Sequence, residues 1–267
     1  MSVEASARRL RAHSPTLDES RIETAIRCCD LTSLDPAATE PDVAILAARA
    51  LKPAEHRDLT AAAICVLAPQ VRAAAAALSG SEVRVAAATG GFPGGRIPLS
   101  TKLAEINEAV DAGADEIDVV VDRTPLSSGD FSAVENEVRS FRKAAGPALL
   151  KVILETGELR DYSTMSNLAA AALRGGADML KTSTGRARTG ATVEAALVLG
   201  RAILRHFEST GTAAGLKVAG GIKKAGTAVT FMLAVEEILG PEWLHPDRFR
   251  IGASDLLDDL VGQLRSE

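Results

Sequence analysis

Three lysines lie inside runs of apolar residues that are typical of β-strands: Lys151, Lys181 and Lys217. A buried ammonium group is costly unless it is paired, and burial or a neighbouring cation lowers a lysine pKa toward neutrality. A neutral lysine amine attacks carbonyl carbons and forms a Schiff base. In the alternative interpretation each lysine only pairs with a strand carboxylate such as Glu155 or Asp118. Because Lys181 and Lys217 end neighbouring strands, we favour the first, with Lys217 supplying the charge that keeps Lys181 partly neutral.

An acidic group stands in the middle of another apolar strand, in Asp115-Glu116-Ile117-Asp118 followed by three valines. Because side chains alternate along a strand, Glu116 and Asp118 share a face, and Asp115 belongs to the preceding turn. Two carboxylates inside a barrel and beside lysines can move protons. The alternative is an ion pair that only fills the barrel interior, and the spacing favours proton transfer.

Glycine-bearing loops follow the last three expected strands. They contain Thr182-Ser183-Thr184-Gly185, Gly220-Gly221, and Gly252-Ala253-Ser254, which opens a helix. Glycine allows close backbone approach, and the N–H groups of a helix N-terminus favour an anion. Such loops often serve only as turns, but three on successive strand ends predict a phosphate site, to which Arg186 would add charge.

Three further features are weak when taken alone. Asp30-Leu31-Thr32 closes the first expected strand, and these polar residues either position substrate hydroxyls or cap a helix. Gly90–Gly95 follows the third strand and is consistent with a simple turn. Cys65 lies within the second strand, where a small buried hydrophobe is more usual than a catalytic thiol.

Eight short runs rich in Val, Ile or Leu must position these residues. We expect strands at Ile26–Leu31, Ala62–Leu67, Val83–Ala88, Glu116–Val121, Leu149–Leu154, Met179–Thr182, Leu216–Ala219 and Phe249–Ile251. Helical periodicity predicts helices at Leu17–Ala25, Pro41–Leu51, Val71–Leu78, Leu99–Ala112, Ala133–Ala145, Leu168–Arg174, Val193–Phe207, Ala225–Leu239 and Leu256–Leu264.

Strands that alternate with helices predict βαβ units and a parallel sheet. Eight units in this length favour an α/β fold of one closed (β/α)8 TIM barrel, with an extra N-terminal helix, over an open sheet. We expect one domain over 1–267, in which 1–16 form a flexible or helical extension. The active sites of such barrels lie at the carboxyl ends of the strands, where the polar residues above fall.

The composition excludes several classes of protein. The 267 residues are 46% hydrophobic and 24% charged, with a mean hydropathy of +0.10 and a net charge of −5, so neither disorder nor a nucleic-acid surface is indicated. Aromatic residues make up only 3% of the chain. No apolar run approaches the roughly 18 residues of a membrane span, and the N-terminus resembles no secretion signal. Three cysteines give no disulfide framework, four scattered histidines complete no metal site, and we expect a cytoplasmic location.

The chain resembles the deoxyribose-phosphate aldolase family, in segments that span most of its length in family order. The most specific is Lys181-Thr182-Ser183-Thr184-Gly185 joined to Glu116-Ile117-Asp118-Val119-Val120 upstream. The matching segments are Asp30–Leu34, Thr60–Val66, Gly91–Pro93, Gly113–Val120, Leu150–Leu159, Gly176–Gly185, Lys217–Ile222 and Arg250–Ser254.

The resemblance implies a metal-free class I aldolase that reversibly cleaves 2-deoxy-D-ribose 5-phosphate to D-glyceraldehyde 3-phosphate and acetaldehyde, in deoxynucleoside catabolism. By its motifs, Lys181 forms the Schiff base, Lys217 keeps Lys181 partly neutral, and Asp118 relays protons through a water. No cofactor is implied. Asp30, Thr32 and Cys65 would line the substrate pocket, Lys151 would support the active site, and Thr182, Gly185, Arg186, Gly220, Gly221, Gly252 and Ser254 would bind substrate toward its phosphate.

Three departures from the family pattern matter. Asp255 stands where many relatives carry a second small hydroxyl residue, and we expect it to face the N-terminus of the following helix rather than the phosphate. Arg186 replaces a frequent lysine, which keeps the charge and changes the geometry. The sequence ends at Glu267 without the tyrosine that some relatives place near the substrate, so we expect no proton transfer from a tail.

Two other functions stay open at this point. The first is a lysine-dependent aldolase of the same barrel with a different donor or acceptor. The second is a catalytically silent barrel that binds a phosphosugar through the same glycine loops, against which both lysines and Asp118 argue. The expected partner is a small phosphosugar, with neither nucleic acid nor membrane. The resemblance is compatible with a homodimer, because dimers are common in the family, but the sequence does not fix the oligomeric state.

Overall fold

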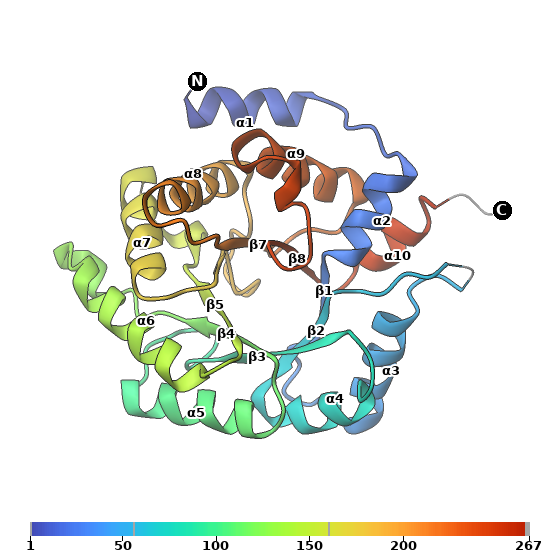
Figure 1. Cartoon of the computed structure of the whole chain (residues 1–267), viewed down its shortest axis with the longest axis horizontal. Helices are drawn as coiled ribbons and strands as arrows, with labels where there is room; N and C mark the ends of the chain where they lie inside the picture. Colours follow the sequence, from blue (N-terminus) through green and yellow to red (C-terminus); the bar gives the residue numbers. More distant parts are fainter. Residues whose placement is uncertain (1, 56, 160, 265–267) are drawn as a thin grey trace.

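The apolar runs pair with one another, in sequence order, as the parallel strands of a closed barrel (Figure 1). The computed structural model describes residues 2–55, 57–159 and 161–264. The strands are β1 (Cys29–Thr32), β2 (Ala63–Leu67), β3 (Arg84–Thr89), β4 (Glu116–Val120), β5 (Leu149–Ile153), β6 (Met179–Lys181), β7 (Gly215–Ala219) and β8 (Phe249–Ala253). Pairing of β8 with β1 closes the barrel, which confirms the predicted (β/α)8 fold.

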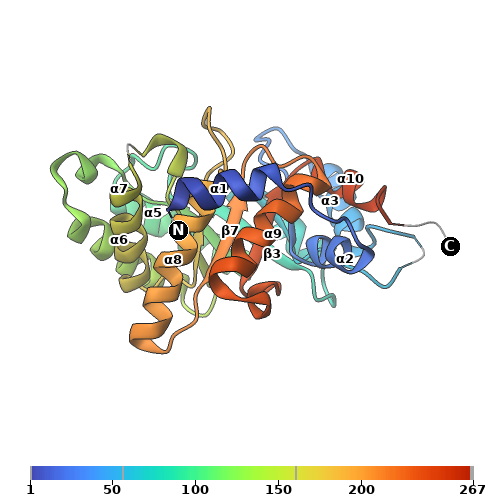
Figure 2. The same cartoon turned by 90° about the horizontal axis from the view of Figure 1, so that it is seen from above.

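Helices surround the barrel and cover its outer face (Figures 1 and 2). Side chains that accept hydrogen bonds from the first turn fix where several of them begin, including Asp18, Asp130, Asp161 and Thr192. The α-helices are α1 (Val3–Ala12), α2 (Glu19–Arg27), α3 (Glu40–Leu51), α4 (Val71–Ala77), α5 (Leu99–Asp111), α6 (Phe131–Ala145), α7 (Tyr162–Arg174), α8 (Val193–Thr210), α9 (Ala225–Leu239) and α10 (Leu256–Val261).

Two helices, rather than the one expected, precede β1. The first, α1, lies across α8 and α9 and gives residues 3–12 helical structure (Figure 2). The second, α2, extends through Ile26 and Arg27, which the sequence pattern assigned to a strand. That assignment was wrong because Ile22, Ala25 and Ile26 form the buried face of one helix, and strand pairing begins only at Cys29.

The boundaries of α7 and β8 are among the others that differ from the prediction. Helix α7 begins at Tyr162, six residues earlier than predicted, because the Asp161 side chain accepts a hydrogen bond from the backbone N–H of Thr164. Strand β8 continues through Gly252 and Ala253, which pair with Asp30 and Leu31 of β1. These two residues therefore belong to the barrel wall and not to a loop.

Polar and small side chains fill the inside of the barrel, whereas its apolar core lies between the strands and the helices. Outward-facing residues such as Ile117, Val119 and Leu180 belong to the continuous hydrophobic core with the helices. Inward positions alternate with them and carry Lys, Asp, Glu and Arg beside Ala and Gly. The small residues leave room for the long charged side chains.

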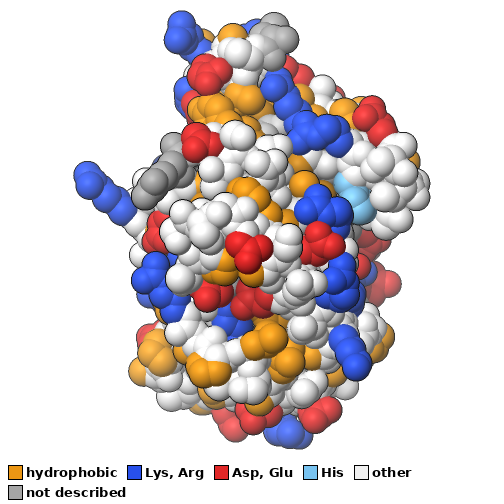
Figure 3. All heavy atoms as spheres, turned by 90° about the vertical axis from the view of Figure 1, so that its left-hand side faces the viewer, with side chains coloured by type: hydrophobic (Ala, Val, Ile, Leu, Met, Phe, Trp, Pro, Cys, Tyr) orange, Lys and Arg blue, Asp and Glu red, His pale blue; other side chains and the backbone are white. Residues whose placement is uncertain are grey.

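The face shown in Figure 3 carries acidic and basic side chains interspersed with one another, so this face has no field of a single sign. Over the described ranges 2–55, 57–159 and 161–264, no helix has the length and apolarity that a membrane crossing requires.

Candidate active site at the carboxyl ends of the strands

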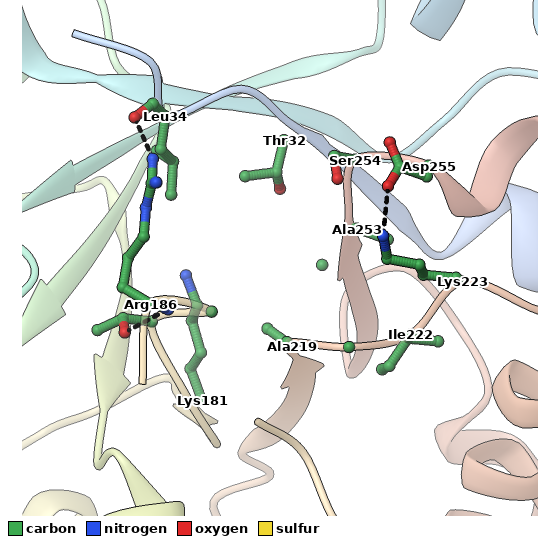
Figure 4. A pocket seen from close by; sticks show the side chains of 15 residues that line it. Thr32, Leu34, Lys181, Arg186, Ala219, Ile222, Lys223, Ala253, Ser254 and Asp255 are labelled. Atoms are coloured by element: carbon green, nitrogen blue, oxygen red, sulfur yellow. Dashed lines mark hydrogen bonds and ion pairs between the residues drawn. The ribbon is translucent and has the colours of Figure 1, made fainter. Parts of the chain in front are cut away.

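A cavity of about 360 Å³ opens at the carboxyl ends of β1, β6, β7 and β8 (Figure 4). The loops after these four strands line it, as the barrel architecture predicts. The lining residues are Thr32, Leu34, Lys181, Thr184, Gly185, Arg186, Ala219, Gly220, Gly221, Ile222, Lys223, Gly252, Ala253, Ser254 and Asp255. Eight of the residues predicted for the site therefore come together: Thr32, Lys181, Gly185, Arg186, Gly220, Gly221, Gly252 and Ser254.

Lys181 ends β6 and extends its amine toward the middle of this cavity (Figure 4). The residue is 2% exposed. Its Nζ donates a hydrogen bond to Oδ2 of Asp118 at 2.7 Å, which is the one carboxylate contact of this amine within the part of the chain that the structure describes. An amine in this position can reach a molecule in the cavity.

Asp118 lies on β4 beneath the cavity and contacts all three predicted lysines. Its Oδ2 accepts hydrogen bonds from Lys181 and Lys217, and its Oδ1 accepts one from Lys151, each at 2.7 Å. Burial by itself raises the pKa of Asp118, but attraction to Lys151, Lys181 and Lys217 outweighs burial and holds the pKa well below its usual value. Asp118 is therefore ionised at neutral pH.

Two carboxylates and one guanidinium extend the network below Asp118. Lys217 also contacts Asp30, Lys151 also contacts Glu116, and Arg250 contacts both Asp30 and Glu116 at 2.6 Å. We call these seven residues the central charge cluster: Asp30, Glu116, Asp118, Lys151, Lys181, Lys217 and Arg250. All but Lys181 are 0% exposed.

The carboxylates keep the deeper lysines protonated. Burial by itself lowers the pKa of Lys217, but attraction to Asp118 and Asp30 overrides it and places the pKa well above its usual value. For Lys151, attraction to Asp118 and Glu116 likewise outweighs burial and raises the pKa. Both side chains are ammonium ions at neutral pH, and Lys217 shares Oδ2 of Asp118 with Lys181.

Sequence reasoning did not single out Arg250, although it lay within a segment that carried the resemblance. Its guanidinium is buried, and Nη2 and Nη1 lie 2.6 and 3.2 Å from Oε1 and Oε2 of Glu116. Alternation along β8 supplied a signal, because a cation beside Lys217 in register must share its inward face.

Glycine avoids crowding at two positions of the site. Gly220 has a φ of +92°, and a Cβ there would lie 2.9 Å from the Cα of Gly190, so the loops after β6 and β7 pack backbone against backbone. At Gly252, a Cβ would lie 3.0 Å from Cε of Lys217. Gly252 therefore provides room for the Lys217 side chain, a second reason for glycine besides the predicted phosphate loop.

Three charged side chains stand around the cavity mouth (Figure 4). Arg186 donates a hydrogen bond to the backbone carbonyl of Leu34, which joins the loop after β6 to the segment after β1. Lys223 and Asp255 form an ion pair at 3.1 Å, with side chains 68% and 59% exposed. Asp255 is the N-cap residue of α10, as expected from its position, but its carboxylate makes no capping hydrogen bond and pairs with Lys223 at the cavity instead.

Some predicted residues lie outside the cavity lining. Asp30 and Lys151 belong to the central charge cluster, and the Cys65 Sγ lies 3.8 Å from Oδ2 of Asp118. Burial raises the pKa of the Cys65 thiol, which is therefore protonated at neutral pH. The Thr182 hydroxyl accepts a hydrogen bond from the Ala219 backbone N–H at 3.0 Å and so ties β6 to β7.

Glu155, named as an alternative partner for the lysines, instead accepts hydrogen bonds from the backbone N–H and hydroxyl of Thr184.

Cys28 and Cys29 are adjacent in the sequence, and both are buried and free. Burial raises the pKa of each of these two thiols to about 12. Among residues 2–55, 57–159 and 161–264, no group of three or more His, Cys, Asp or Glu side chains could hold a metal ion. The expectation that no C-terminal tyrosine assists proton transfer concerns Glu267, which lies outside the described residues.

This arrangement can support covalent catalysis by an amine. A nucleophile lies at the edge of a cavity, a carboxylate that can exchange protons touches it, and two fixed ammonium ions lie behind that carboxylate. Glycine-rich backbone and basic side chains stand at the other end of the cavity, where an anion can bind.

Comparison with known proteins agrees with this chemistry. The profile of the DeoC/LacD family aldolases matches residues 24–240. Deoxyribose-phosphate aldolase of Bos taurus is 40% identical over 252 residues, covering 90% of this chain and 79% of the relative, and that of Mus musculus is 44% identical over 212 residues, covering 79% and 67%. A tetrameric deoxyribose phosphate aldolase from Aeropyrum pernix superposes with a TM-score of 0.70 at 29% identity, covering 97% of each chain. The chain belongs to the DeoC/LacD family of aldolases.

Proposed function

We propose that this aldolase cleaves 2-deoxy-D-ribose 5-phosphate reversibly to D-glyceraldehyde 3-phosphate and acetaldehyde, through a Schiff base on Lys181. The observation that carries the proposal is the position of Lys181: it is the one member of the central charge cluster, as far as the structure describes the chain, that lines the cavity. The names of the relatives supply the substrate, and the chemistry of the site agrees with it.

The charges of the cluster support Lys181 as the neutral amine. Four of its members are basic and three are acidic, so full protonation would leave one positive charge in excess in a buried site. Lys151, Lys217 and Arg250 each contact at least two carboxylates, whereas Lys181 contacts one. Loss of the Lys181 proton removes the excess at the smallest cost in ion pairs.

Each step of the cleavage has a group to perform it. The Nζ of Lys181 attacks C1 of the open-chain sugar, and loss of water leaves a protonated imine. Removal of the C3 hydroxyl proton then breaks the C2–C3 bond, and the electron pair passes into the imine to form an enamine. Protonation of C2 and hydrolysis release acetaldehyde and return the amine. Asp118, which contacts Lys181, is placed to relay these protons, and Lys217 and Lys151 hold it.

The far end of the cavity suits the phosphate of this substrate. Gly220 and Gly221 bring backbone close to the cavity, Gly185 and Gly252 line its walls, and Ser254 adds a hydroxyl. We propose that Arg186 and Lys223 attract the negatively charged phosphate to the mouth of the cavity.

We assign the remaining predicted residues to supporting roles. Thr32 lines the cavity and would contact a sugar hydroxyl. Asp30 and Lys151 would act through the central charge cluster, Cys65 would close the barrel interior next to Asp118, and Thr182 would hold β6 against β7.

A coupled assay tests the proposal: purified protein is supplied with 2-deoxyribose 5-phosphate, and release of glyceraldehyde 3-phosphate is followed. We expect cleavage by the wild type and none by Lys181→Leu. Binding of the phosphosugar without cleavage would identify the silent barrel instead, and cleavage of a different aldol only would identify a related aldolase.

We further propose that residues 1–267 act as one domain, that the chain forms a homodimer and that it works in the cytoplasm. Three free, buried cysteines are consistent with a reducing compartment. Light scattering after size-exclusion chromatography measures the assembly, and the tetramer described for the Aeropyrum pernix relative is the alternative result.

A further inference from the structure

Arg250 lies inside the barrel, on the side of the central charge cluster away from Lys181. Its Nη1 lies 2.6 Å from Oδ1 of Asp30, and its Nη2 lies 2.6 Å from Oε1 of Glu116. Its Nε donates to the backbone carbonyl of Pro246. The proposed reaction gives this residue no task, and its side chain does not line the cavity around Lys181.

Arg250 is the one basic member of the cluster that keeps its proton under all conditions at which proteins function. The excess positive charge of the cluster must therefore be removed from a lysine. Without the guanidinium, three lysines would face three carboxylates, and every lysine could stay protonated without excess charge.

The surroundings of Lys181 direct the loss of a proton to that residue. The titratable groups on the packed strands are Asp118 on β4, Lys151 on β5, Lys217 on β7, Asp30 on β1 and Cys65 on β2. Directly after β5, the buried carboxylate of Glu155 accepts hydrogen bonds from Thr184 of the loop that follows Lys181. The thiol is protonated, so it adds no negative charge. Arg250 holds Asp30 and Glu116, which in turn hold the ammonium groups of Lys217 and Lys151 behind Asp118.

At the cavity mouth, the charged groups are Arg186, Lys223 and Asp255. Lys223 and Asp255 neutralise each other and are mostly in solvent, where charges are screened. Arg186 is exposed as well, so its charge is also screened, and the buried cluster supplies the unscreened charge around the Lys181 amine.

We propose that Arg250 is a positioning residue for the Schiff-base lysine: its permanent charge, held by Asp30 and Glu116, keeps the Lys181 amine neutral at physiological pH. This inference rests on the proposed function, because it needs Lys181 to be the nucleophile. A purely structural Arg250 would support the barrel without affecting the pH at which the amine becomes reactive.

The test measures kcat/KM for cleavage of 2-deoxyribose 5-phosphate from about pH 5 to about pH 9 in four variants. The acidic limb of this profile reports protonation of the free enzyme, and the titration of the substrate phosphate is common to all variants. The variants are Arg250→Met, Arg250→Lys, Glu116→Gln and Arg84→Met.

The proposal predicts shifts of opposite sign. Arg250→Met removes a positive charge and should move the acidic limb up by about one pH unit, whereas Glu116→Gln removes a negative charge and should move it down. Arg250→Lys keeps the positive charge, so its acidic limb should lie at the same pH as that of the wild type even if its kcat is lower. Arg84→Met is the matched control: Arg84 also reaches Glu116, at 3.3 Å, but its side chain is 39% exposed and paired with Asp247, so its loss should shift the limb far less.

An unshifted acidic limb in folded Arg250→Met, with kcat alone reduced, would overturn the proposal and leave Arg250 a structural residue. If Arg250→Met does not fold, Glu116→Gln decides, and an acidic limb that stays in place or moves up would overturn it. Absence of cleavage by the wild type would instead refute the proposed function, and the inference with it.

Discussion

Lys181 and Lys217 share one oxygen: the amine of each lies 2.7 Å from Oδ2 of Asp118. The two amines can therefore be separated by no more than twice that distance. Two ammonium ions so close repel each other, and Lys217 has a second carboxylate, Asp30, that keeps it charged. The repulsion therefore acts on Lys181, which has the fewest ion pairs and the most open position.

The first prediction concerns Asp118. Asp118→Asn removes the carboxylate that touches three lysines while keeping the size of the side chain, so the proposed proton relay is lost. We expect kcat/KM for cleavage to fall by about 10²–10⁴-fold. Asp115→Asn is the control, because its carboxylate binds the backbone N–H of Val85 outside the cluster, and it should stay within about twofold of wild type. Equal losses in the two variants would contradict a special role for Asp118.

The second prediction concerns Gly252. A methyl group at this position would lie 3.0 Å from Cε of Lys217, so Gly252→Ala should displace the lysine from Asp118. We expect kcat/KM to fall by about 10²-fold, the effect of a small misplacement in an active site. Gly226→Ala on α9 meets no atom within 4 Å and should leave the activity unchanged. Wild-type rates for Gly252→Ala would show that Lys217 has more freedom than the structure indicates.

The third prediction concerns the ion pair at the cavity mouth. Asp255→Ser removes a negative charge from the proposed phosphate end and frees Lys223. We expect KM for 2-deoxyribose 5-phosphate to fall about fivefold, while KM for 2-deoxyribose, which has no phosphate, stays the same. Asp258→Asn, an exposed carboxylate paired with Arg49, serves as the control. A KM that is unchanged or raised for the phosphorylated sugar would place the phosphate away from Asp255.

The fourth prediction concerns stability at low pH. Attraction to buried cations outweighs burial and holds the pKa of Asp30, Glu116 and Asp118 below their usual values. Below about pH 4 the unfolded chain therefore takes up protons more readily than the folded chain, and the free energy of unfolding decreases. We expect a nearly constant Tm between about pH 6 and about pH 8 and a steep decline below about pH 4. A Tm at pH 3 equal to that at pH 7 would contradict the buried ion pairs.

Much of the fold could be predicted because strands that are buried against helices are rich in Val, Ile and Leu, as β4 and β5 are apart from their inward-facing charged residues. The boundaries that failed lay where local chemistry overrides the pattern. Ile26 continues the apolar face of α2. The Asp161 side chain caps α7, so this helix begins before the first of its buried apolar residues. Parallel pairing with β1 makes Gly252 part of a strand although glycine usually indicates a loop.

Much of the site followed from lysines and an aspartate within apolar strands, since alternation places them on one inward face. The depth of the network could not be predicted, because it depends on which strands meet across the barrel. Asp30 contacts Lys217 and Arg250, which lie 187 and 220 residues away from it in the sequence. The direction of the Asp255 side chain likewise depended on Lys223, a residue of another loop.

Borohydride trapping tests the central claim most directly. The protein is incubated with 2-deoxyribose 5-phosphate, reduced, digested and mapped by mass spectrometry, with Lys181→Leu and substrate-free protein as controls. A reduced adduct on Lys181 that is absent from both controls is the expected result, together with a loss of cleavage of about 10⁴-fold or more in Lys181→Leu. An adduct on Lys217 or Lys151, or none from folded protein that binds the sugar, would contradict the assignment of Lys181 as the nucleophile.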